Sequence, residues 1–162
     1  MAKPDRRDVM TWTIGLIAVA SLSAQETSRP RPYTPEAVLE RLRDRVGVSP
    51  IECGRHPLPE SLTPPDSYAD ALTASVRCVV DAAALRRQSW MFVQRQGIDS
   101  WVATGLVSGA DGVVQRFDYD SDPSGGSGAA ATLHMTSCGA PTVTRNRDVG
   151  LACSTPTSKP AP

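Results

Sequence analysis

The chain has 162 residues, of which 40% are hydrophobic, and its 17 basic and 17 acidic residues give a net charge of zero. This length suits one domain with a single hydrophobic core. The balanced charge argues against a nucleic-acid-binding domain and offers no acidic block for a cationic partner.

The first 24 residues have the pattern of an export signal. Lys3, Arg6 and Arg7 precede an apolar run of 12 residues, 13–24, that ends in small residues. A helix needs about 20 apolar residues to cross a bilayer, so we expect cleavage near Ala24 rather than a membrane anchor. The Arg6-Arg7 pair fits a twin-arginine signal, and an ordinary secretory signal fits equally well. The mature protein is therefore expected in the periplasm or outside the cell.

Residues 25–33 are polar and interrupted by proline, which predicts a flexible linker ahead of a helix. Thr34 suits the capping position, Pro35 suits the first helical position, and Gly47 suits the end of the helix. Four apolar residues at helical spacing form one face: Val38, Leu39, Leu42 and Val46. The charged residues around them mix both signs, which predicts a solvated surface rather than a binding patch.

Five prolines between residues 49 and 65 predict an irregular loop. A second helix is expected to begin near residue 66 and to run towards residue 87. It contains spaced aliphatic residues and Cys78.

The chain from residue 90 to residue 138 is rich in apolar, β-branched and aromatic residues with intervening turn signals. Four strands are expected, over residues 90–93, 100–107, 113–120 and 130–137. Trp90 and Trp101 are candidates for ligand stacking, and core packing is the simpler interpretation.

Two helices ahead of four strands predict an α+β fold. In it, two N-terminal helices pack on one face of a four-stranded antiparallel sheet that is stapled by disulfides. The domain is expected to cover residues 34–153, followed by a disordered tail over residues 154–162.

Alternation along the strands predicts one core face and one polar face. The expected core residues are Val102, Leu106, Val113, Phe117, Tyr119, Leu133 and Met135. The polar face holds Arg116, Asp118, Asp120 and His134, and a regular hairpin would place Arg116 opposite His134. This face is the expected binding surface, and the wet side of a half-covered sheet is the alternative.

Four cysteines in an exported chain are expected to form disulfides. Three pairings are possible. Pairing between neighbours in sequence favours Cys53–Cys78 and Cys138–Cys153. Each loop of about 15 to 25 residues is worth on the order of 3 kcal/mol in the chain-entropy picture.

The residues give little support for a metal or another cofactor, so none is expected. The spacing of Cys53 and His56 suits zinc, but no second close pair of ligands accompanies them. The aspartates between residues 118 and 122 resemble the start of a calcium loop, but Pro123 stands where that loop needs glycine.

The chain lacks a Gly-x-Ser-x-Gly motif, and no catalytic residue is expected. These observations predict a non-catalytic binding module that recognises an unknown protein or peptide through Arg116, Asp118, Asp120 and His134. One alternative is a small secreted hydrolase that uses His134 with Asp118 or Asp120. Another is a structural module stabilised by a metal ion.

Overall fold

The computed structural model describes residues 34–57, 65–125, 130–145 and 149–154. In these residues the elements are α1 (Pro35–Val46), β1 (Ile51–His56), α2 (Asp66–Ala84), β2 (Ser89–Gln96), β3 (Trp101–Ser108), β4 (Val114–Asp120), β5 (Thr132–Ser137), β6 (Ala140–Arg145) and β7 (Val149–Ser154). Strands β1 to β5 form one sheet in that order, and β6 pairs with β7 in a separate hairpin. None of the helices in the described ranges is long and apolar enough to span a membrane.

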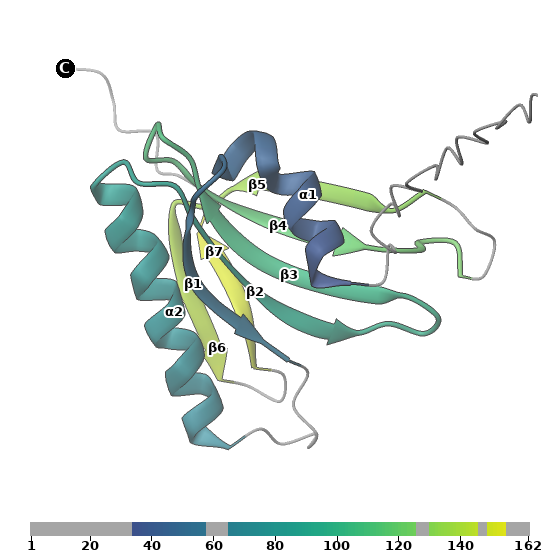
Figure 1. The fold of residues 1–162 in the computed structure, drawn as a ribbon. Coiled ribbons are helices and arrows are strands. Elements are labelled where there is room, and N and C mark those ends of the chain that lie inside the picture. Colours follow the sequence, from purple (N-terminus) through teal and green to yellow (C-terminus); the bar gives the residue numbers. More distant parts are fainter. Residues whose placement is uncertain (1–33, 58–64, 126–129, 146–148, 155–162) are drawn as a thin grey trace, which may run out of the picture.

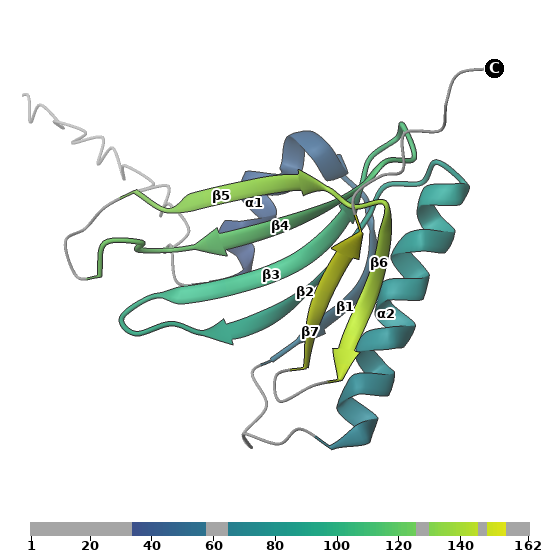
Figure 2. The same cartoon turned by 180° about the vertical axis from the view of Figure 1, so that it is seen from behind.

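The five-stranded sheet is the middle layer of the domain. Helix α1 lies on one face of it, called the α1 face here, and α2 and the β6–β7 hairpin lie on the other, the α2 face (Figures 1 and 2). The sheet is mixed, because β1 runs parallel to β2 while the other neighbours are antiparallel. The prediction of two helices on one face of a four-stranded antiparallel sheet is therefore wrong.

Three strands were missed for local reasons. Strand β1 lies between Pro50 and Pro57 and contains Gly54, so the segment lacks alternation and reads as a loop. It is stabilised by parallel pairing with β2, which the α2 crossover brings beside it. Strands β6 and β7 lie beyond the last expected strand and pair only with each other.

The α1 face carries an aromatic core. Helix α1 buries Val38, Leu42 and Val46, which follow one another at intervals of four residues. They pack against six side chains from the sheet: Trp90, Phe92, Ala103, Val107, Phe117 and Tyr119. This packing fixes α1 over the middle strands and leaves β1 and part of β2 beside it, as Figure 1 shows.

The α2 face has an aliphatic core braced by the two disulfides. Helix α2 and strands β2 and β3 contribute buried aliphatic and methionine side chains: Leu72, Val76, Val79, Met91, Val93 and Leu106. One disulfide joins Cys53 of β1 to Cys78 of α2, and the other joins Cys138, after β5, to Cys153 of β7. Both predicted disulfides are thus confirmed.

Covering the sheet on both sides divides the expected core between two faces. Phe117 and Tyr119 face α1, whereas Leu106 faces α2 and pairs with Arg116. Val113 lies outside the strands and is 43% exposed. The expectation of a single core face was wrong. Strand β3 is buried on both sides, so its sequence does not alternate between apolar and polar residues.

The pairing of β4 with β5 differs by two residues from the expected register. Arg116 is opposite Thr136, and Asp118 is opposite His134. Asp120 pairs with Thr132, so the connection between the strands is longer than the glycine-rich turn alone. A shift of two residues keeps every side chain on its original face, which is why the expected set of polar residues still shares one surface.

Candidate functional site

The expected polar surface lies on the α2 face beside the β6–β7 hairpin. One guanidinium nitrogen of Arg116, Nη2, donates to Asp118 Oδ1 at 2.9 Å, and Nη1 donates to the backbone oxygen of Leu151 in β7 at 3.3 Å. Asp118 also accepts a hydrogen bond from the Thr104 hydroxyl. Arg116 and Asp118 are thus engaged in holding the hairpin against the sheet, and His134 lies exposed opposite Asp118 on the edge strand β5.

Asp120 is separate from that network. Its Oδ1 accepts a hydrogen bond from the backbone N–H of Asp122 at 3.0 Å, which supports the turn after β4. In the ranges that the structure describes, no three His, Cys, Asp or Glu side chains are grouped so that they could hold a metal ion. Residues 126–129 of the calcium-like loop lie outside those ranges. The Cys53 sulfur is bonded to Cys78, so it is no zinc ligand in this oxidised form.

A histidine–serine pair lies between β1 and α2. His56 Nε2 and Ser75 Oγ are 2.8 Å apart, and the Tyr68 ring meets the His56 ring edge-on with the ring centroids 6.1 Å apart. Partial burial lowers the pKa of His56 below its ordinary value. Ser75 is only 6% exposed, so the pair lacks the accessible nucleophile that a hydrolase needs. It joins strand to helix.

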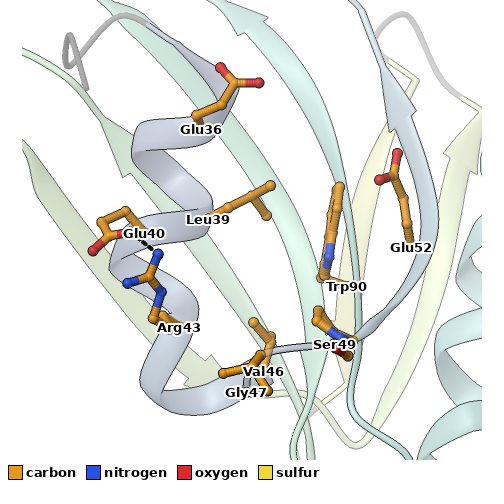
Figure 3. Close-up of a pocket in the computed structure, with 11 residues that line it drawn as sticks. Glu36, Leu39, Glu40, Arg43, Val46, Gly47, Ser49, Glu52 and Trp90 are labelled. Atoms are coloured by element: carbon orange, nitrogen blue, oxygen red, sulfur yellow. Dashed lines mark ion pairs between the residues drawn. The ribbon is translucent and has the colours of Figure 1, made fainter. Parts of the chain in front are cut away.

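A groove of about 630 Å³ lies on the α1 face between α1 and β1 (Figure 3). Its apolar lining includes Leu39 and Val46 from α1 and Trp90 from β2. Carboxylates from both sides line it as well: Glu36, Glu40 and Glu52. The remaining lining residues are Arg43, Gly47, Val48, Ser49 and Pro50. This volume falls within the range of ligand-binding pockets, and the lining offers both apolar and charged contacts.

The sequence places these groups together through two simple periodicities. Spacings of three and four residues put Glu36, Leu39 and Arg43 on one stripe of α1. Glu52 of β1 is the register partner of Trp90 in β2, so their side chains project side by side from the same face. Figure 3 shows the helix on one side of the groove and the strand on the other, with Trp90 between them.

Arg55 connects the two sides of the groove. Its Nε and Nη2 donate to the two carboxylate oxygens of Glu52 at 2.9 and 3.2 Å, and its Nη1 lies 3.5 Å from Glu36 Oε1. Its guanidinium carbon is 5.0 Å from the centroid of the Trp90 ring, within the range of a cation–π contact. The hydrogen bond to Glu52 raises the pKa of Arg55, so this cation stays charged. A bulge between Glu52 and Gly54 gives Arg55 its place on the same face as Glu52.

Sequence reasoning did not find this groove. The sequence marks Trp90 as a candidate for ligand stacking, but it predicts a solvated surface for the charged residues around the apolar face of the first helix. The missing information was β1, because only that strand brings Glu52 and Arg55 beside Trp90. Comparison with known proteins finds no matching family model, curated protein or solved structure.

Proposed function

We propose that the protein is an exported, disulfide-bonded and non-catalytic binding module of the cell envelope or extracellular space. It takes a protein or peptide ligand in the groove between α1 and β1. The observation that carries this proposal is the combination of an apolar floor with carboxylates on both rims in one cavity of about 630 Å³. The two disulfides and the apolar run near the N-terminus support export to an oxidising compartment.

The groove suits a ligand better than the polar surface of Arg116, Asp118, Asp120 and His134. The Arg116 and Asp118 side chains already bind the hairpin, the sheet and each other. A ligand at that surface would have to compete with these contacts. The groove instead offers Val48, whose side chain is 93% exposed at its edge, as an apolar contact.

The two histidines, one of which the hydrolase alternative would need, lie outside the groove. Neither His56 nor His134 lines the groove. His56 is hydrogen-bonded to the buried Ser75, and His134 is an exposed residue of the edge strand β5. The groove therefore contains no general base of the type that a histidine-dependent hydrolase would use.

Selection from a random peptide library tests the proposal. Peptides enriched on the purified, oxidised protein are measured against the wild type and three variants. Val48→Asp removes the exposed apolar contact at the edge of the groove and should weaken binding by about tenfold. Ile98→Asp changes an equally exposed aliphatic residue in the turn between β2 and β3 and should leave binding unchanged.

The third variant, His134→Ala, reports on the polar surface. Loss of binding in His134→Ala, with Val48→Asp unaffected, would move the ligand to the α2 face and refute the groove. The groove would also be refuted if every enriched peptide bound Val48→Asp as tightly as it binds the wild type.

A further inference from the structure

We infer that Arg55 occupies, in the free protein, a cation site built by Trp90, Glu36 and Glu52, and that the ligand of the groove is an extended polypeptide segment whose own arginine or lysine takes that place. This inference rests on the proposed function and specifies the ligand. It concerns the end of the groove where β1 and the start of α1 face each other.

The groups around Arg55 are those that select a cation. An aromatic face lies 5.0 Å from the guanidinium carbon, and carboxylates approach the guanidinium from the strand and from the helix. An indole face and paired carboxylates recognise guanidinium and ammonium groups in the same way, whichever chain supplies them. The contacts of Arg55 show directly that the site accommodates such a group.

Arg55 can be replaced at little cost. Its side chain is 40% exposed, and that of Glu36 is 64% exposed. Exposed ion pairs contribute little to stability, and exchanging one guanidinium for another preserves the charge balance. Without Arg55, the lining of the groove has three carboxylates and a single guanidinium, that of Arg43, which pairs with Glu40 at 2.5 Å. The two remaining carboxylates then favour a cation from the ligand.

The rest of the groove suits an extended chain. Leu39, Val46 and the exposed Val48 continue the apolar lining away from the cation site. Strand β1 is the edge of the sheet and pairs only with β2 among the described strands. The Ile51 N–H donates to Gln88 of the β2 side, so alternation directs the backbone groups of the next residue, Glu52, away from β2. An added strand can use these groups.

Two synthetic pentapeptides test the inference. One is acetyl-Val-Arg-Val-Arg-Val-amide, and the other has citrulline, a neutral analogue of the same shape, in place of each arginine. Binding of the arginine peptide should be roughly three- to tenfold tighter than binding of the citrulline peptide. On binding, the indole N–H resonance of Trp90 should shift in a ¹⁵N–¹H spectrum, because the Trp90 ring meets a new cation.

Variants separate replacement of Arg55 from ordinary attraction. Arg55→Ala empties the site and should tighten the arginine peptide roughly three- to tenfold, since the ligand no longer competes with an internal cation. Adding Glu52→Gln should remove that gain. Arg77→Ala is the matched control, because Arg77 forms an exposed ion pair with Asp81 on α2. It should change nothing.

Equal binding of the two peptides, or an Arg55→Ala protein that binds the arginine peptide no more tightly than the wild type, would overturn the inference. The proposed function would survive if library peptides still bind the groove. Dimer formation by Arg55→Ala in sedimentation would point to a second copy as the occupant. If replacing Arg29 and Arg31 alone tightened binding of the arginine peptide, the occupant of the groove would be the chain's own N-terminal segment. Either result would also overturn the inference.

Discussion

Gly54 determines how the two faces of β1 are used. It has φ of +155° at the bulge, and Arg55 and His56, the next two residues, project to opposite faces of the sheet. A Cβ at this position would lie 2.5 Å from Ser75 Oγ and 2.8 Å from His56 Nε2. The residue is therefore glycine both for its backbone conformation and for lack of space.

Gly54→Ala is expected to lower the free energy of unfolding by about 1–3 kcal/mol, because it adds a clash to an unfavourable backbone conformation. Denaturant titration measures this. Gly125→Ala is the control, since Gly125 also has positive φ but has open space around its Cβ position. Equal losses in the two variants would show that the contact with Ser75 and His56 is unimportant.

His56 makes stability depend on pH. Burial lowers its pKa in the folded protein, so the unfolded chain binds the proton more readily. The free energy of unfolding should therefore rise with pH between the lowered pKa of His56 and about 6.5. This contribution should be lost as the pH falls through that interval. His56→Gln should flatten this part of the curve, whereas His134→Gln should retain it. A curve that is unchanged in His56→Gln would refute the assignment.

Single elements differ in how far the sequence predicts them. Helix α1 has local signals at both ends, with Pro35 at the first helical position and Gly47 after the last turn, and the structure follows them. Strand β1 has no such signal, because its pairing partner is 38 residues away (Ile51 with Ser89) and depends on α2. The polar residues of β4 and β5 share a face as expected, because a register shift of two residues leaves every side chain on its original face. Their contacts with the hairpin were unpredictable without β7.

The two disulfides should have different effects on the groove. Cys138–Cys153 holds the hairpin on the α2 face, whereas Cys53–Cys78 holds β1, which lines the groove. Replacing Cys138 and Cys153 by serine removes the cross-link that closes a 15-residue loop. The free energy of unfolding should fall by about 3 kcal/mol. Hydrogen exchange should increase first in β6 and β7, with peptide affinity unchanged.

Replacing Cys53 and Cys78 by serine should instead weaken peptide binding as well as stability, because β1 loses its covalent link to α2. If peptide affinity fell equally in the two double-serine variants, the two faces of the sheet would not be independent.

In the whole molecule, the two faces of the sheet differ in how they are stabilised. The α2 face carries a helix, a hairpin and both disulfides, while the α1 face carries one helix and the groove. The arrangement suits a small domain that works outside the cytosol, where disulfides supplement a limited core.

Export itself has a direct test. The protein recovered from its native host compartment should contain no alkylatable thiol, and its mass should correspond to cleavage near Ala24. Four alkylated cysteines on an uncleaved chain would contradict export.

The position of the ligand can be measured in a backbone ¹⁵N–¹H spectrum titrated with an enriched peptide. Binding in the groove predicts that the resonances that move belong to α1, the residues from Gly47 to Glu52, and Trp90. It would be contradicted by shifts confined to the surface of Arg116, Asp118 and His134.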